Sequence, residues 1–236
     1  MKKYIISFAF LQLSASVNDV NAQSKNIIQK IKLANQLPNM EYDYNMYLFD
    51  VMLKEKVDST KGHLRVKDGQ YVDSNGYALT ARVGDYFCKL DHVQHTATIC
   101  NMPELSKRTG IKFVNDEFKV TQSITDTFLN NESNLIIDSS DSKFYRIKIR
   151  TKNHSLSYAQ MDFWRSNYKL AGAYFETEMK SNDEPQFNRL TSIHIRNVKH
   201  LPDNKGFDLK WVFNLVSNKP TLTKKYSTYK LIPLEN

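Results

Sequence analysis

The strongest constraint on the fold is a succession of about a dozen short segments rich in Tyr, Phe, Val, Ile and Thr, which fills the chain from Glu41 onward. Several segments alternate apolar and polar residues, as strands with one buried face do. In Phe144–Arg150, for example, Tyr145, Ile147 and Ile149 share one face and the basic residues share the other. Because parallel strands would need crossover helices, the pattern predicts an antiparallel meander, and so long a sheet is expected to curl.

Two helices are predicted beside the strands. Ile27, Ile28 and Ile31 begin a helical apolar stripe over residues 25–37, and Asn101–Gly110 combines a capping Asn with late basic residues and a terminal Gly. The last strands are expected at Phe207–Val216 and Lys225–Ile232. The predicted fold class is therefore mainly β with few helices: a single curved antiparallel sheet forming an incomplete β-barrel, with an N-terminal lid helix and a short inserted helix.

The first 22 residues have the features of a secretory signal peptide. Lys2 and Lys3 precede an apolar run, Tyr4–Leu13, that is shorter than the roughly 20 residues a membrane span needs. Val20 and Ala22 then occupy the positions that a signal peptidase reads before Gln23. The predicted organisation is a signal peptide over residues 1–22 and a single β half-barrel domain over residues 23–236, periplasmic or secreted after cleavage.

The chain carries a formal net charge of +8, but its Lys and Arg residues are dispersed, as on an ordinary solvated surface. No nucleic-acid partner is expected. The aromatic residues are more informative, because a curled sheet with one helix across it has more inward-facing apolar surface than that helix covers. They are expected to line an apolar concave face, with the candidate ligand-binding residues Phe49, Phe87, Phe163, Trp164, Trp211 and Phe213.

The two cysteines, Cys88 and Cys100, belong to a predicted hairpin within Gly76–Cys100. If its turn spans His92–Thr96, the two thiols lie opposite each other and can form a disulfide in an oxidising compartment. If the turn is the tighter Asp91–Gln94, the register shifts and both thiols stay free.

The sequence contains no recognisable catalytic or cofactor motif. His92 and His95 lie in a turn with Asp91 but lack a third metal ligand. There is no Gly-x-Ser-x-Gly elbow and no phosphate-cradling glycine loop. No enzyme activity, no cofactor and no metal site are therefore predicted.

Some local phrases resemble a known family. Gly84–Phe87 leads to Asp91 and then to Thr96–Ile99, and Tyr145–Ile149 is followed by Met161–Trp164. These phrases, and the order of elements, resemble the LolA superfamily of half-barrel envelope proteins, which includes periplasmic lipoprotein carriers. The resemblance implies an incomplete barrel with helices along its open side and an apolar cavity for acyl chains. This chain is longer at its C-terminal end than the family, and no functional residue of the family is transferred to it.

Taken with the resemblance, the sequence predicts a non-enzymatic envelope protein that binds a lipid or the acyl chains of a lipoprotein. Lys148 and Arg150 are the candidate contacts to an anionic head group. A monomer is expected, with envelope proteins as further candidate partners and with peripheral membrane contact. Two alternatives stay open: a closed β-sandwich module that docks another protein, and a secreted hydrolase.

Overall fold

A computed structural model describes residues 24–35, 39–68, 70–109, 135–150, 156–179, 189–202, 208–216 and 219–232. The predicted signal peptide, and a strand expected at Glu117–Val120, lie outside these residues. The paragraphs below concern only the described parts of the chain.

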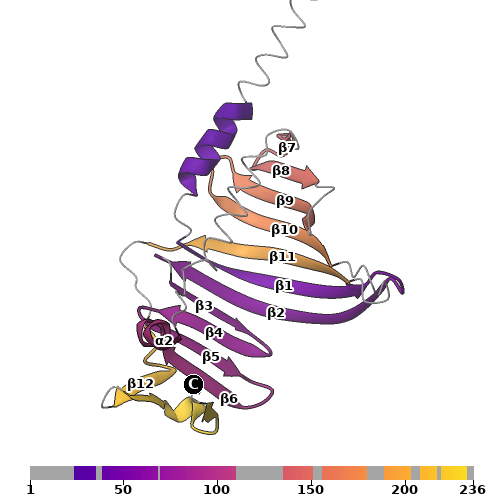
Figure 1. Cartoon of the computed structure of the whole chain (residues 1–236). Coiled ribbons are helices and arrows are strands. Elements are labelled where there is room, and N and C mark those ends of the chain that lie inside the picture. Colours follow the sequence, from indigo (N-terminus) through magenta and orange to yellow (C-terminus); the bar gives the residue numbers. More distant parts are fainter. Residues whose placement is uncertain are drawn as a thin grey trace, which may run out of the picture.

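Within the described residues, twelve strands form one sheet in the order β14-β6-β5-β4-β3-β2-β1-β11-β10-β9-β8-β7 (Figure 1). The sheet consists of two meanders, β1 to β6 and β7 to β11, which meet where β1 pairs with β11. The strands are β1 (Met40–Asp50), β2 (Glu55–Lys67), β3 (Gln70–Asn75), β4 (Ala78–Val83), β5 (Tyr86–Asp91), β6 (Thr96–Asn101), β7 (Leu135–Asp138), β8 (Phe144–Arg150), β9 (Leu156–Trp164), β10 (Leu170–Met179), β11 (Arg189–His200) and β14 (Lys230–Ile232).

The predicted curved, mainly antiparallel and unclosed sheet is confirmed, with one difference at its edge. Strand β14 pairs with β6 in parallel, through Leu231 and Ala97 among others. Sequence reasoning excluded parallel pairs because it considered only local connections. Strand β14 instead reaches this edge from the far end of the chain.

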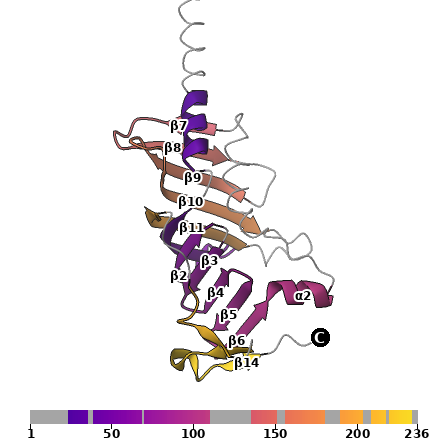
Figure 2. The ribbon, with the colours of Figure 1, turned by 90° about the vertical axis from the view of Figure 1, so that its left-hand side faces the viewer.

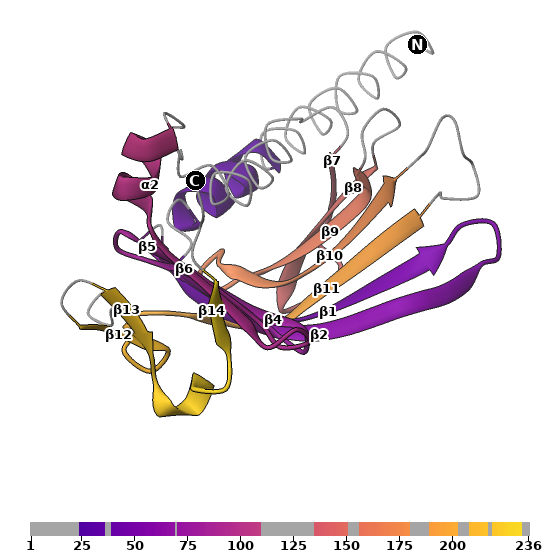
Figure 3. The ribbon, with the colours of Figure 1, turned by 60° about the horizontal axis from the view of Figure 1, so that its bottom comes forward.

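Register irregularities accompany the curvature. Strand β1 has one against β11, between Glu41 and Asp43, and another against β2, between Leu48 and Phe49. Opposite the first, Asn197 takes a left-handed conformation with a φ of 54°. Such bulges bend strands and increase their twist. The sheet thus has an inner, concave face and an outer face (Figure 3).

The helix over residues 24–34 packs on the inner face. Its apolar stripe contributes Ile28 and Ile31, and Ile31 is fully buried. Beneath it lie the alternate residues of β8 and β9, including Ile147 and Met161, which are Cα partners. One apolar stripe on a helix therefore covers the apolar face of one pair of strands.

Residues 208–216 and 219–229, here called the C-terminal segment, cover the outer face at the other end of the sheet. Leu209, Val212 and Phe213 pack on alternate residues of β4, β5 and β6, such as Leu79 and Leu90. The predicted long strand Phe207–Val216 is wrong: residues 210–212 form a turn, and the strand β12 covers only Phe213–Val216. It pairs with β13 (Lys219–Leu222), and a 3-10 helix, η3 (Lys224–Tyr226), follows.

The predicted inserted helix is confirmed as α2 (Met102–Thr109), which follows β6 (Figure 2). Asn101 Oδ1 accepts a hydrogen bond from the backbone N–H of Glu104 at 3.1 Å, as an N-cap does. Lys107 and Arg108 lie in its last turn, where they interact favourably with the helix dipole.

The disulfide between Cys88 and Cys100, one of the two alternatives that the sequence left open, is not formed. Cys88 pairs with Ile99, and Cys100 pairs with Phe87, so the register is one residue away from the bridging one. Because neighbouring residues of a strand point to opposite faces, the two thiols lie on opposite sides of the sheet. Both are free, and burial raises the pKa of Cys88 to about 12.

Candidate functional site

The main candidate site is a row of partly exposed apolar side chains on the inner face, here called the inner stripe. Directly paired residues of neighbouring strands point to the same face. Phe175 pairs with Ile193 and Ala173 with Ile195, while Ile193 pairs with Met46. The inner stripe comprises Phe175, Ile193, Ile195, Met46 and Leu48, contributed by β10, β11 and β1.

The inner stripe is continuous with the core under the helix. Ala173 and Phe175 pack against the cluster that contains Ile31 and Met161. Farther from the helix, the covering becomes incomplete, and Met46 keeps 37% of its surface exposed. A half-covered apolar row beside a short amphipathic helix is a surface that a flexible apolar ligand can complete.

A network of polar side chains lies on the inner face over β2 and β3, next to the inner stripe. The ring of Tyr44 lies over Gly62, where an added Cβ would fall 2.3 Å from the ring. The Tyr44 hydroxyl donates to Asp73 Oδ1 at 2.9 Å and accepts from Asn75 Nδ2 at 3.1 Å. Burial raises the pKa of Asp73 and that of Tyr44, the latter to about 12. The network keeps the half-buried carboxyl group of Asp73 hydrogen-bonded.

Cationic residues follow on the inner face beyond this network. Asp73 pairs with Thr80 and Tyr71 with Arg82, and Thr80 in turn pairs with Lys89. Arg82 is half-buried and Lys89 is exposed. The inner face therefore changes from apolar at β10, β11 and β1 to polar and cationic at β4 and β5, which matches the division of an amphiphile into chain and head group.

The aromatic residues predicted to line a concave face do not form one site. Phe163 and Phe87 are on the inner face, where Phe163 is buried under the helix and Phe87 is half-buried on β5. Phe49 and Trp164 are on the outer face. The remaining two belong to the C-terminal segment on the outer side, with Trp211 43% exposed and Phe213 buried. Their contact with a ligand stays a prediction.

The predicted head-group residues, Lys148 and Arg150, lie on the outer face of β8, opposite Ile147 and Ile149. Lys148 Nζ is 3.4 Å from Asp138 Oδ2, and the Arg150 guanidinium is 5.8 Å from the centroid of the Tyr158 ring. The structure therefore does not bring these cations beside the inner stripe, and their role at a head group stays a prediction.

An aromatic row crosses the outer face over β9, β10, β11 and β1. Successive ring centroids in this row are 5.8, 4.5, 5.5 and 6.5 Å apart. The row consists of Tyr158, Tyr174, His194, Tyr47 and Phe49. Desolvation, followed by the nearby Arg196, lowers the pKa of His194, which favours the neutral imidazole at the centre of the row. It stabilises the middle of the sheet through cross-strand pairs.

Sequence reasoning missed the inner stripe. The signal was present in the alternation of residues 41–50 and 189–200, but both segments also carry aromatic residues on the opposite face. The prediction was based on aromatic residues, so it named Phe49 and Trp164 and not Met46 or Ile193.

In the parts of the chain that the structure describes, no group of three His, Cys, Asp or Glu could hold a metal ion. No described helix has the length and apolarity to cross a bilayer.

Comparison with known proteins gave structural matches only. No family model matches the sequence, and no curated protein does. An uncharacterised conserved protein from Thermus thermophilus aligns with 89% of this chain and 99% of its own, at 5% identity and a TM-score of 0.39. A LolA superfamily protein from Nitrosomonas europaea covers 78% and 97%, at 10% identity and a TM-score of 0.31. A DUF1329 family protein from Desulfovibrio piger covers 79% and 94%, at 8% identity and a TM-score of 0.29.

Proposed function

We propose that this chain is an exported envelope protein that binds a lipid, or the acyl chains of a lipoprotein, on the inner face of its half-barrel. It acts as a carrier rather than as an enzyme. The observation that carries the proposal is the inner stripe, an apolar row that the helix over residues 24–34 covers at one end and leaves partly open at the other. An acyl chain laid along this row would extend the core that Phe175 already joins.

Burial of acyl methylenes on the inner stripe is expected to supply the binding energy. Each buried methylene contributes about 0.8 kcal/mol, so burial of roughly eight methylenes yields about 6 kcal/mol before the cost of association. The head group would then lie toward β4 and β5, near Arg82 and Lys89. These two cations favour an anionic head group over a neutral one.

A fluorescent fatty acid, cis-parinaric acid, tests the inner stripe. Replacement of Met46 by Asp places a charge on the stripe at a position that is exposed enough to be tolerated, and we expect at least a fivefold loss of affinity. Met52→Asp is the matched control, because Met52 is 64% exposed in the turn after β1. Equal affinities of the two variants, or no binding by the unaltered chain, would contradict the proposal.

The position of the head group is tested by charge reversal on each face. We expect Lys89→Glu on the inner face to weaken binding of cis-parinaric acid, with little effect on a neutral alcohol of the same chain length. Lys148→Glu provides the outer-face comparison. If only Lys148→Glu weakens binding, the head group lies beside Lys148, the contact predicted from the sequence, and not beside Lys89.

Extraction of lipid from protein purified from cells distinguishes the carrier from the alternative docking module. A carrier should yield acyl chains in near-stoichiometric amount, whereas a docking module should yield none. Mass measurement of the same material tests export, since a mature chain is expected to begin at Gln23.

A further inference from the structure

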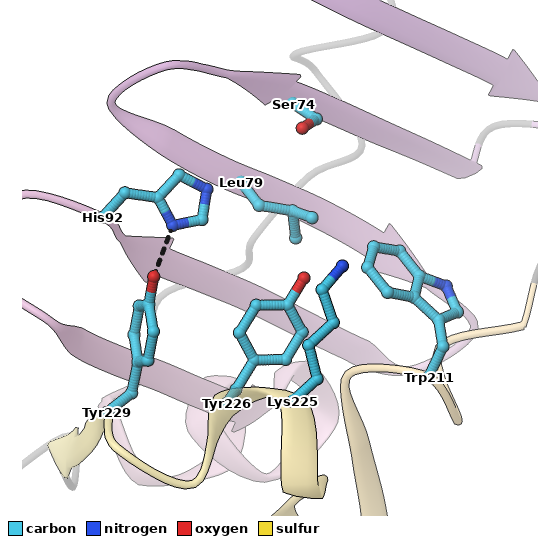
Figure 4. Close-up of a pocket in the computed structure, with 7 residues that line it drawn as sticks. All are labelled: Ser74, Leu79, His92, Trp211, Lys225, Tyr226 and Tyr229. Atoms are coloured by element: carbon cyan, nitrogen blue, oxygen red, sulfur yellow. Dashed lines mark hydrogen bonds between the residues drawn. The ribbon is translucent and has the colours of Figure 1, made fainter.

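A pocket separate from the inner stripe lies on the outer side between the sheet and the C-terminal segment (Figure 4). The sheet contributes Ser74 from β3, Leu79 from β4 and His92 from the turn after β5. Its volume is about 520 Å³, within the range of small-molecule sites. The C-terminal segment forms its other wall with Trp211, Lys225, Tyr226 and Tyr229.

Packing fixes the aromatic walls of this pocket. Tyr226 is buried in the apolar cluster between the C-terminal segment and the sheet. Its ring packs edge to face on that of Tyr229, with ring centroids 5.5 Å apart. A hydrogen bond of 2.8 Å joins the Tyr229 hydroxyl to His92 Nδ1. The backbone N–H of Lys230 donates to the His95 carbonyl at 2.8 Å, which attaches β14 beside the turn. The walls are therefore in place before any ligand binds, and binding costs little ordering entropy.

The lining combines ring faces, hydroxyl groups and a cation. Lys225 Nζ lies 5.5 Å from the Trp211 ring centroid and 5.1 Å from that of Tyr226. Figure 4 shows its ammonium group between these two side chains, inside the pocket. None of the seven lining residues carries a carboxylate, and no ion pair among the described residues involves Lys225. An anionic ligand can therefore interact with this ammonium group.

We propose that this pocket binds an acidic sugar residue, that is, a sugar ring that carries a carboxylate. The C–H face of a sugar ring packs on exposed aromatic rings, and Trp211, which is 43% exposed, offers such a surface. The hydroxyl groups of Ser74, Tyr226 and Tyr229 supply donors and acceptors for sugar hydroxyls. Lys225 pairs with the carboxylate.

Two other ligand classes fit the lining less well. An acyl chain needs apolar walls, but Leu79 is the only aliphatic residue among the seven described residues of the lining. A bare phosphate is best held by several converging donors, often a bidentate Arg, whereas Lys225 is the only Lys or Arg among the described lining residues. A ring with both a C–H face and a carboxylate uses the rings and the cation together.

Tryptophan fluorescence allows a direct test. The chain contains two tryptophans, Trp164 on β9 and Trp211 in the pocket, so in a Trp164→Phe background the emission reports on Trp211 alone. The probe is digalacturonic acid, and the neutral galactose disaccharide, inorganic phosphate and benzoate are compared with it. Isothermal titration of the unaltered chain repeats the comparison without the Trp164 substitution.

We expect digalacturonic acid to change the emission and to bind at least tenfold more tightly than the neutral disaccharide, phosphate or benzoate. Lys225→Ala should weaken its binding at least fivefold, whereas Lys224→Ala, which removes the neighbouring lysine outside the lining, should leave it unchanged. Equal binding of phosphate or benzoate, equal loss in the two lysine variants, or no binding of digalacturonic acid would overturn the proposal. Binding of cis-parinaric acid should not respond to Lys225→Ala, which separates this pocket from the inner stripe.

Discussion

At the scale of single residues, Tyr44 and Gly62 show how one missing side chain shapes the inner face. Because Gly62 has no Cβ, the Tyr44 ring can lie across β2 and reach Asp73 on β3. The Asp73 carboxyl group is partly desolvated, and the Tyr44 hydroxyl donates a hydrogen bond to it. A glycine in a strand often marks such a close approach.

Replacement of Gly62 by Ala is expected to destabilise the chain by about 1 to 3 kcal/mol, because the new methyl group must displace the Tyr44 ring and break its bond to Asp73. Urea unfolding measures this change. Gly76→Ala is the control, because its added Cβ meets nothing within 4 Å. Similar unfolding midpoints for the two variants would show that the ring does not occupy this position.

At the scale of elements, the helix over residues 24–34 has two distinct sides. Ile31 is fully buried against β8 and β9, whereas Leu33 is 67% exposed. Asn35 fixes the end of the helix by donating from Nδ2 to the Tyr168 carbonyl at 2.9 Å and by accepting from the Leu170 backbone N–H at 3.1 Å. If the helix acts as a lid, we expect it to pivot about Asn35 as a rigid body.

Ile31→Ala should remove about 2 to 5 kcal/mol of packing from the buried side of the helix. We expect faster amide hydrogen exchange over residues 24–34 and tighter or faster uptake of cis-parinaric acid. Leu33→Ala should change the unfolding free energy by less than about 0.5 kcal/mol, since its side chain faces solvent. Unchanged exchange in the Ile31 variant would mean that this contact does not hold the helix closed.

At the scale of the whole molecule, the described residues form two cores on opposite faces and at opposite ends of one sheet. The helix core lies on the inner face over β8 and β9, and the C-terminal core lies on the outer face over β4, β5 and β6. The two clusters share no residue. Strands β1 and β11 connect the parts of the sheet that carry them.

Val212→Ala in the C-terminal core and Ile31→Ala in the helix core should therefore have independent effects. Both side chains are fully buried. The loss of unfolding free energy in the double variant is expected to equal the sum of the single losses to within about 0.5 kcal/mol. Urea unfolding of the four proteins measures this. A coupling above about 1 kcal/mol would show that the cores respond as one.

The sequence by itself determined most strands, the two helices and the curled form of the sheet. Alternation as in Tyr145, Ile147 and Ile149 is a local property, and it reflects which face of a strand is buried. The cap at Asn101 is equally local, because the side chain bonds a backbone group three residues away. These signals depend on near neighbours and can be read without the fold.

Only the tertiary structure decided which faces meet. One residue of register places Cys88 and Cys100 on opposite sides of the sheet, and the sequence does not specify the register to that precision. The same uncertainty explains why Phe49 and Trp164, expected on the concave face, lie on the outer one: alternation separates the two faces of each strand without showing which one is concave. The C-terminal pocket and the parallel β14 depend on contacts between residues more than a hundred positions apart, such as His92 and Tyr229, and no local pattern encodes these contacts.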